Sequence, residues 1–530
     1  MLRLVTREEI EDARRRLSEL LDARAEWFVR EGTRGVELRR GEWELRVAPG
    51  RLLFSYWGEA GPRVWRVAAW EACGGKLLLE AARRMGAERA RLELVPRASA
   101  AEGASVVAAA RAQACERLAA RAAAFAAGSR VERARLSEGA RRGEPGRYAR
   151  ILLRRGRRLL AATGPVAPLG PQEADAFLVS ALLWFTRLGR TRRAPAPEGL
   201  WLIAPQKLAP AVGERIALLR AGLREVITLL EADDAGSLTP VEAPPLDDLL
   251  ARPAPRLFRP APAVESELVA RIVALAPDAI DVVRARRGET LRFRGLPFAR
   301  VRRLMGREQL WCGVGRGEDR RLLDAPHVPE LPNAPHAPEL LDAPHAPELL
   351  RLVSELAEHR RADAPDRAHA LYRAAPEAWL ESLLRRDITR LDPGLRLAPL
   401  HAQLRTAPAA GGARPVDLLA LRRDGRLVVI ELKVSEDAAH ALQGADYWRR
   451  IEAHRRAGHI RRARLFGDAP LADTPPLVYL VAPALRFHRA LGAVARAITP
   501  AVELYRFDLN EDWRAGVRVT RRVTLTNNWQ

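Results

Sequence analysis

Asp417, Glu431 and Lys433 are the residues whose types and spacing most directly indicate chemistry. The chain has 88 Lys and Arg residues, of which only Lys76, Lys207 and Lys433 are Lys. A Lys that persists in so Arg-rich a chain indicates a position where a planar guanidinium cannot replace a compact ammonium group. Two neighbouring carboxylates repel unless a proton or a cation lies between them, and hard oxygen ligands suit Mg²⁺. The three residues predict an Mg²⁺ site that accepts substrate phosphates, or else a structural ion pair at a strand end.

A predicted hairpin brings these residues together. Two apolar strands within residues 414–434 are joined by a three-residue turn, Arg423–Gly425, with Gly at the left-handed position. The resulting register places three pairs opposite each other: Leu421 and Leu427, Leu419 and Val429, Asp417 and Glu431. Because side chains alternate between the faces of a strand, Glu431 and Lys433 share one face.

The hairpin and its flanks resemble the PD-(D/E)XK nuclease superfamily, specifically its NucS-like and RecB-like branch. The matching residues are Pro415-Val-Asp417 at the first strand and Glu431-Leu-Lys433 after the turn. Downstream, Gln443-Gly-Ala-Asp-Tyr447 is similar to the Gln-x-x-x-Tyr element of that branch, and an amphipathic helix lies upstream at residues 376–384. The resemblance covers roughly residues 370–510 and implies a restriction-endonuclease-like α/β domain.

The resemblance also implies roles for the residues of the hairpin. Asp417 and Glu431, together with the Leu432 carbonyl, would hold Mg²⁺ or Mn²⁺. Lys433 would orient or help deprotonate the attacking water and stabilise charge on the phosphate. Glu381, on the upstream helix, would bind a metal-bound water or a second metal.

Further residues of the flanking helices would complete such a site. An earlier acidic residue of the upstream helix, Glu377, competes for the role of helix-borne carboxylate. Gln443 and Tyr447 would contact the phosphodiester or orient the Lys, because residues four apart share a helical face; simple packing is the alternative. Arg449 and Arg450 begin a basic helix that would track phosphates, or would form an ordinary solvated face.

Residues 145–235 repeat the order of elements found in residues 414–510. A two-residue turn, Arg155-Gly156, would place Ala149 opposite Ala162. Asp417, Glu431 and Lys433 would then correspond to Ala149, Ala162 and Gly164. An apolar helix at 175–188 follows, then strands at 200–205 and 226–233 that match 478–483 and 502–508. The pattern indicates either an internal duplication whose first copy has lost its ligands or two generic αβ units.

The whole chain is predicted to be a multidomain protein of mixed α/β class. The expected parts are a Trp-containing β-rich domain (1–98), an Ala-rich helix with a degenerate nuclease-like α/β unit (99–240), a Pro-rich connector with a small α+β module (241–321), a repeat linker (322–350) and a nuclease-like catalytic domain (351–530). The tryptophans of the first part would stack bases or form its core. His327, His336 and His345 of the linker recur every nine residues, too far apart in an extended chain to share an ion.

Composition limits the partners and the compartment. A formal charge of +22 favours a polyanion, and nucleic acid fits best. Cys73, Cys115 and Cys312 indicate neither a disulfide framework nor a zinc site. With no signal peptide and no apolar run of the roughly 18 residues that would span a membrane, the sequence predicts a cytoplasmic protein without membrane contact.

Together these features predict an Mg²⁺- or Mn²⁺-dependent endonuclease or DNA-processing phosphodiesterase, acting on DNA rather than RNA, in repair or defence. The alternative is a nucleic-acid-binding or scaffolding protein whose nuclease-like fold does not cut. The oligomeric state stays open, and a monomer is expected if the duplication replaces a dimer.

Overall fold

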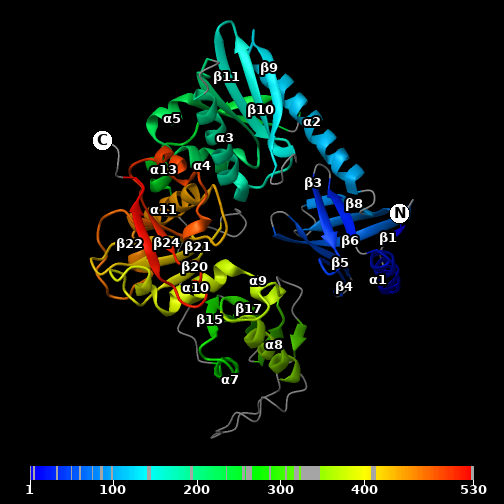
Figure 1. Cartoon of the computed structure of the whole chain (residues 1–530), viewed down its shortest axis with the longest axis vertical. Helices are drawn as coiled ribbons and strands as arrows, with labels where there is room; N and C mark the ends of the chain where they lie inside the picture. Colours follow the sequence, from blue (N-terminus) through cyan, green and yellow to red (C-terminus); the bar gives the residue numbers. More distant parts are fainter. Residues whose placement is uncertain are drawn as a thin grey trace. The chain divides into compact units, whose positions relative to one another are not determined.

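The computed structural model has a mixed α/β architecture (Figure 1), as predicted. Contacts divide the chain into two compact units: residues 1–169, 187–209 and 226–241, and residues 170–186, 210–225 and 242–530. The structure describes all residues except 1, 4–5, 25, 32–33, 49–50, 59–60, 74–75, 84–87, 97–99, 140–144, 191–194, 234, 253–256, 258–265, 286–287, 305–306, 315–320, 324–345, 407–413 and 527–530. Most of the repeat linker, with its three His residues, therefore lies outside the described residues.

The N-terminal part is an antiparallel sheet with one helix, which confirms the predicted β-rich class. Helix α1 (Arg7–Asp22) begins at a capping box formed by Thr6 and Glu9. The sheet has the order β3-β2-β8-β7-β6-β5-β4, with β1 paired to β6. Its strands are β1 (Leu2–Arg3), β2 (Glu26–Glu31), β3 (Arg34–Arg39), β4 (Trp43–Ala48), β5 (Arg51–Gly58), β6 (Gly61–Cys73), β7 (Lys76–Arg83) and β8 (Glu88–Pro96). Trp27, Trp65 and Trp70 are buried in its core, so these three pack rather than offer stacking surfaces.

A first six-stranded sheet has the order β14-β13-β12-β11-β10-β9. Its elements are α2 (Ala100–Phe125), β9 (Arg130–Glu138), β10 (Pro145–Arg155), β11 (Arg158–Pro165), η3 (Pro171–Glu173), α3 (Ala174–Gly189), β12 (Gly199–Pro205), α4 (Ala209–Ile216), α5 (Ala221–Val226), β13 (Ile227–Ala232) and β14 (Leu238–Val241). Strands β11, β12 and β13 run parallel to one another, and the other pairs are antiparallel. Helix α2 packs its Ala-rich face on β9 and β10.

A second six-stranded sheet, β20 to β25 in sequence order, has the same strand order and the same directions. Its elements are α10 (Pro376–Arg386), η6 (Ile388–Arg390), β20 (His401–Leu404), β21 (Val416–Leu421), β22 (Leu427–Leu432), α11 (His440–Arg456), α12 (His459–Arg462), β23 (Leu477–Pro483), η8 (Ala484–Arg486), α13 (Leu491–Ala497), β24 (Glu503–Leu509) and β25 (Val519–Thr524). The shared order extends beyond residues 145–235 and 414–510, because each sheet also has one added strand at either edge.

Between these sheets in sequence lies a smaller antiparallel module, held together by Arg360. It comprises α7 (Glu267–Ala274), β15 (Ile280–Ala285), β16 (Gly288–Phe293), β17 (Leu296–Leu304), β18 (Arg307–Cys312), β19 (Arg321–Leu323), α8 (Ala346–His359) and α9 (Ala370–Arg373), whereas the preceding α6 (Leu246–Ala251) packs on α11. The fully buried Arg360 guanidinium donates hydrogen bonds of 2.6–3.3 Å to the carbonyls of Phe293, Arg294, Leu371, Ala374 and Ala375. It also lies 4.7 Å from the Trp379 ring centre, so one side chain joins β16 and α9 of the module to helix α10.

The two hairpins differ in how well their register was predicted. In the second, Leu419 pairs with Val429 and Leu421 with Leu427, as expected. In the first, Ala149 pairs with Gly164 rather than with Ala162. The prediction was wrong because Gly156, with φ +57°, is the first residue of the two-residue turn and not the second. A primed turn needs positive φ at its first central position, which Gly supplies.

The corrected register changes which residues correspond between the sheets. Thr163 pairs with Leu202, which lies three residues before Pro205 at the end of β12. Glu431 pairs with Leu480, which lies three residues before Pro483 at the end of β23. Since Arg150 pairs with Thr163, the positions equivalent to Asp417, Glu431 and Lys433 are Arg150, Thr163 and Pro165. The first sheet thus has a cation where the second has a carboxylate.

Candidate active site

The hairpin β21–β22 places its acidic residues at the end of a strand pair that is buried except at Asp417, which is half-buried. Every residue of β22 is buried, and Glu431 is 0% exposed. The Asp417 carboxylate accepts a 3.0 Å hydrogen bond from the Leu432 backbone N–H, which ties the first strand's acid to the second strand. The Asp417 and Glu431 side chains lie within hydrogen-bonding reach of each other. The structure therefore brings together the two carboxylates that the hairpin register predicts.

Lys433 lies against this carboxylate pair. Its Nζ donates a short hydrogen bond to Glu431 Oε1 and lies 3.5 Å from the Leu432 carbonyl. Burial, and then the charge of Asp417, raise the pKa of Glu431 well above its ordinary value, while Lys433 opposes that rise. Burial disfavours the ammonium, yet Glu431, Glu377 and Asp417 together raise the pKa of Lys433 above its usual range. In this environment Lys433 is a fixed cation and hydrogen-bond donor at neutral pH.

One buried oxygen of this group lacks a donor. Glu431 Oε2 has no hydrogen-bond partner, and its close neighbour Asp417 carries no proton to donate when ionised. A buried, unpartnered carboxylate oxygen is costly unless a proton or a cation satisfies it. The donor set (Asp417, Glu431 and the Leu432 carbonyl) consists of hard oxygens, which fit Mg²⁺ or Mn²⁺. Within the described ranges, no cluster of three or more His, Cys, Asp or Glu side chains is arranged to hold an ion.

The upstream helix α10 offers two acids, and the structure separates their roles. Glu381 is buried and accepts 2.8 Å hydrogen bonds from Arg292 Nη1 and Gln403 Nε2, so both its oxygens are occupied by the protein. Burial raises the pKa of Glu377, and the charge of Asp417 adds to that rise, while the charge of Lys433 opposes it. The Glu377 carboxylate also accepts a hydrogen bond from the Val434 backbone N–H. Glu377 is therefore coupled to Lys433 directly, whereas Glu381 is held by Arg292 and Gln403.

Helix α11 presents Gln443 and Tyr447 to the carboxylate pair. Gln443 Nε2 donates a 2.9 Å hydrogen bond to the Tyr447 hydroxyl. Burial, and then the charges of Glu431 and Asp417, raise the pKa of Tyr447 far above its usual range, so the phenol stays neutral and can donate its proton. Gln443 Oε1 is also 3.4 Å from Arg414 Nη1. The two residues form one polar pair beside the acids.

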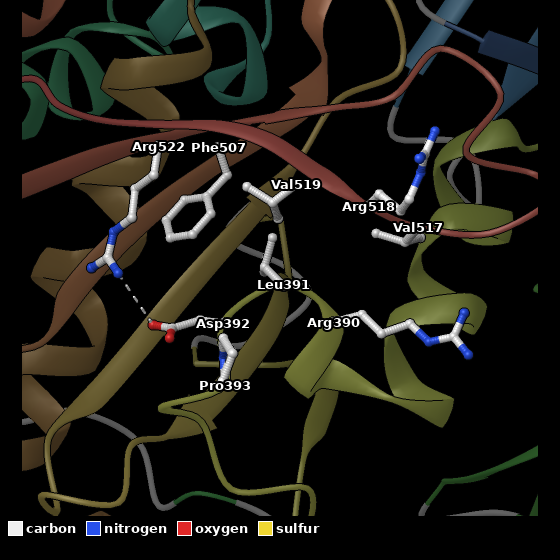
Figure 2. A pocket seen from close by; sticks show the side chains of 9 residues that line it. All are labelled: Arg390, Leu391, Asp392, Pro393, Phe507, Val517, Arg518, Val519 and Arg522. Carbon is white, nitrogen blue, oxygen red and sulfur yellow. Dashed lines mark ion pairs between the residues drawn. The ribbon is translucent and has the colours of Figure 1, made fainter.

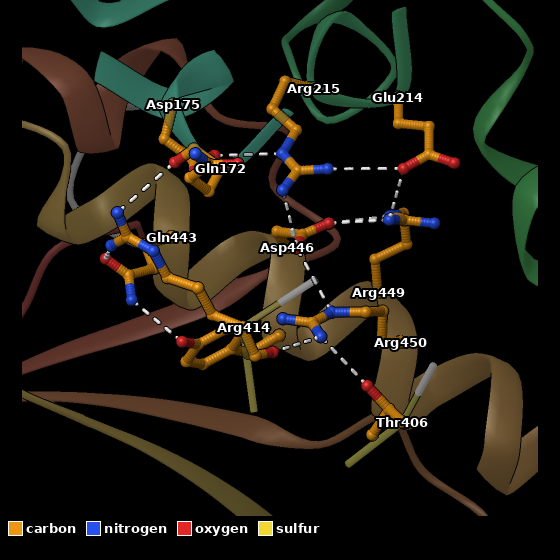
Figure 3. Close-up of polar contacts among 11 residues, drawn as sticks. Gln172, Asp175, Glu214, Arg215, Thr406, Arg414, Gln443, Asp446, Arg449 and Arg450 are labelled. Carbon is orange, nitrogen blue, oxygen red and sulfur yellow. Dashed lines mark hydrogen bonds and ion pairs between the residues drawn. The ribbon is translucent and has the colours of Figure 1, made fainter. Parts of the chain in front are cut away.

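Arg449 and Arg450 lie in a buried network rather than on a basic surface (Figure 3). Each is 8% exposed, and both contact Asp446, at 2.7 Å for Arg449 and 3.1 Å for Arg450. Arg450 also donates to Thr406 Oγ1 at 3.0 Å and lies 4.6 Å from the Tyr447 ring centre. The predicted phosphate contact of these two residues does not match this placement, because almost all of α11 is buried and its charges are neutralised internally.

The sequence analysis missed His440, one helical turn before Gln443. Its ring lies 3.2 Å from the Glu431 backbone carbonyl and stacks on Phe487. Burial, and then the charge of Lys433, lower the pKa of His440 to about 3, so it is a neutral donor that holds the Glu431 backbone. The signal in the sequence was its spacing of three from Gln443, which places both on one helical face.

A hollow of about 680 Å³, apart from the carboxylate pair, is lined by residues of β24 and β25 and by residues 390–393 (Figure 2). Its floor is apolar (Leu391, Phe507, Val517, Val519) and its rim carries Arg390, Arg518 and Arg522. Asp392 accepts a 2.6 Å hydrogen bond from the Tyr479 hydroxyl and lies 3.9 Å from Arg522. Its charge is thus already balanced by the protein.

None of the helices in the described part of the chain is long and apolar enough to cross a membrane. No family model, curated protein or solved structure matches the chain.

Proposed function

We propose that the chain is a metal-dependent nuclease, a phosphodiester hydrolase whose site is formed by Asp417, Glu431 and Lys433. The observation that carries the proposal is the buried Glu431 Oε2, which lacks a donor beside a second carboxylate. An unsatisfied buried oxygen costs roughly 1–3 kcal/mol, and either a proton shared with Asp417 or a cation would remove that cost. A divalent cation would satisfy it and is the group that phosphoryl chemistry also needs.

Mg²⁺ or Mn²⁺ would be held by Asp417, Glu431 and the Leu432 carbonyl, and when bound it would lower the pKa of a water and neutralise phosphate charge. The residues of the chain would do the rest. Lys433, a cation in this environment, would donate to the attacking water or to a phosphate oxygen. Tyr447 and Gln443 would fix that oxygen's position through hydrogen bonds. Glu377 would receive the proton that the water loses, because burial raises the pKa of its carboxyl and it lies beside Lys433.

The proposed substrate is nucleic acid, and DNA rather than RNA. The formal charge of +22 supports a polyanionic partner. Repair of DNA or defence against foreign DNA would be the setting. This part of the proposal rests on the charge and on the resemblance to PD-(D/E)XK nucleases.

A non-cleaving nucleic-acid-binding or scaffolding protein is the second candidate. The short Lys433–Glu431 ion pair favours it, because a Lys bound to a metal-ligating carboxylate competes with the cation. The first sheet, which has Arg150 at the position of Asp417, already shows this fold without metal-binding carboxylates.

The two candidates are separated by one experiment on the full chain. End-labelled single-stranded, double-stranded and branched DNA and RNA are incubated with Mg²⁺, with Mn²⁺ and with EDTA, and binding is measured on the same substrates. Cleavage that EDTA abolishes and that Glu431→Gln lacks supports the nuclease. The exposed carboxylate Asp468 gives the matched control, and Asp468→Asn should cut as wild type does. Binding without cleavage under every metal would instead support the scaffolding candidate.

A further inference from the structure

The same short motif occurs at the junction of η3 and α3 and near the start of α11. Gln172-Glu-Ala-Asp175-Ala-Phe177 and Gln443-Gly-Ala-Asp446-Tyr-Trp448 share Gln, Ala, Asp and an aromatic residue at identical spacing. Each motif follows the second strand of its hairpin and precedes the next parallel strand. The shared residues support a common origin of the two sheets beyond the strand order alone. Ala176 occupies the position of Tyr447 in the first copy.

The two Asp residues of this motif meet at one arginine. Arg215 Nε donates to Asp175 at 2.9 Å and Arg215 Nη2 lies 3.0 Å from Asp446 (Figure 3). All three side chains are about nine-tenths buried or more. Residues 170–186 and 210–225 belong to the same compact unit as residues 242–530, so these contacts lie within one body. Equivalent residues of the two copies thus contact a common partner.

A second contact shows the same symmetry in the backbone. Leu219 and Ile498, which follow the equivalent helices α4 and α13, form an antiparallel bridge. The Arg220 N–H donates to the Ala497 carbonyl at 2.9 Å, and the Thr499 N–H donates to the Leu218 carbonyl at 2.8 Å. This pair of hydrogen bonds is common to any antiparallel bridge. What matters here is that the segments following the equivalent helices of the two copies pair with each other, as an isologous interface requires.

We propose that the chain is a fused pseudo-homodimer with one working site, and that it cuts a single strand of duplex DNA in each binding event. This inference rests on the proposed nuclease function. A symmetric dimer meets the two antiparallel strands of a duplex with two equivalent sites. Here the second site has Arg150, Thr163 and Pro165 in place of the ligands and the Lys. The self-complementary surface is already used within the chain, so no second copy is needed to complete it.

The reaction is a plain hydrolysis at one phosphodiester. The water oxygen forms a new P–O bond, one P–O ester bond breaks, and the leaving oxygen takes up a proton. No oxidant or reductant takes part. The product of this single event on a closed circular duplex is an open circle that retains one intact strand.

The test is cleavage of supercoiled plasmid by the full chain with Mg²⁺ or Mn²⁺, with enzyme in excess over plasmid. We expect complete conversion of the supercoiled band to open circles before linear DNA appears. Sedimentation velocity in the same buffer should give the mass of one chain. Mixing wild type with inactive Glu431→Gln should leave the ratio of open circles to linear DNA unchanged, because no second chain contributes a site.

Each other outcome has a distinct meaning. Linear DNA formed as fast as open circles, or a product ratio that shifts when the inactive variant is added, would overturn the single-strand inference and leave the nuclease intact. Cleavage confined to single-stranded substrates would also overturn it. The absence of cleavage on every substrate would instead refute the proposed function itself.

Discussion

At the residue scale, the candidate site depends on how burial and charge act on a few side chains. Glu431 and Lys433 are buried beside the half-buried Asp417, so neither Glu431 nor Lys433 can move its charge into water. The size and shape of the cationic group at position 433 therefore matter more than its charge alone, because the buried side chains around it leave room for one geometry. Two predictions follow from this environment.

Replacement of Lys433 by Arg should nearly abolish cleavage although the charge is kept. The guanidinium is too large to occupy the place of the ammonium against Glu431. Loss of one preorganised electrostatic contact typically costs on the order of 10²–10³ in rate. Binding should persist, since one charge contributes little of the salt-dependent affinity. Cleavage and binding are measured on the same labelled substrate.

Lys76 gives the matched control, because its ammonium lies in the N-terminal sheet and is half-exposed. Lys76→Arg should cut at the rate of wild type. Full activity of Lys433→Arg would remove the lysine from the mechanism.

Asp417→Asn should lower the pKa of Glu431. The charge of Asp417 is the second cause, after burial, of the raised pKa, so removing it makes ionisation of Glu431 easier. A group whose folded pKa is raised stabilises the fold below its unfolded pKa and loses that contribution as pH rises through the folded pKa. The Asn variant should therefore lose less stability between mildly acidic and neutral pH. Carboxyl ¹³C NMR titration and denaturation across that range measure both effects; an unchanged Glu431 titration would contradict the proximity of the two acids.

At the element scale, α10 and α11 position the side chains around the hairpin. Helix α10 brings Glu377 towards Lys433 and is itself fixed by Arg292, which pairs with Glu381. Helix α11 brings in His440, Gln443 and Tyr447 from one face. The buried Arg360 joins α10 to the smaller module through hydrogen bonds to backbone carbonyls.

Arg360→Lys should destabilise the joint between that module and α10. An ammonium has three donors and cannot reach the five carbonyls that the guanidinium reaches. Each hydrogen bond to a charged group contributes about 1.5–3 kcal/mol, so a loss of at least about 3 kcal/mol in unfolding free energy is expected. Urea denaturation measures it. The neighbouring, half-exposed Arg361 is the control, and Arg361→Lys should change the unfolding free energy by less than about 0.5 kcal/mol.

At the scale of the whole molecule, the chain contains the same six-stranded topology twice. Helix α11, which carries Gln443 and Tyr447, contacts two residues of the first copy: Arg449 donates to Glu214, and Asp446 pairs with Arg215. The first six-stranded unit, which lacks the metal-binding carboxylates, can therefore be retained because its residues support helix α11 of the second unit.

A double-mutant cycle should detect coupling between Arg215 and Asp446. The variants are Arg215→Gln, Asp446→Asn and both together, and the unfolding free energy is measured by denaturation. Contacting buried partners typically show interaction energies of about 0.5–3 kcal/mol. The exposed pair Arg464 and Asp468 serves as the control, with a coupling of no more than about 0.5 kcal/mol. Additive effects for the buried pair would show that Arg215 does not support α11.

The sequence alone was sufficient for the features that depend on neighbours along the chain. Strand alternation and the Asp424-Gly425 turn predicted the register of β21 and β22, since a hairpin register depends only on its turn and its pattern. The same reasoning failed by two residues for β10 and β11, because Gly can occupy either position of a two-residue turn.

Tertiary structure decided what depends on residues far apart in sequence. It paired Glu381 with Arg292 and left Glu377 beside Lys433. It also buried Arg449 and Arg450 against Asp446 and Glu214. A sequence gives the charge of a side chain but not its distant partner, and for buried ions the partner determines whether the charge is available to a substrate.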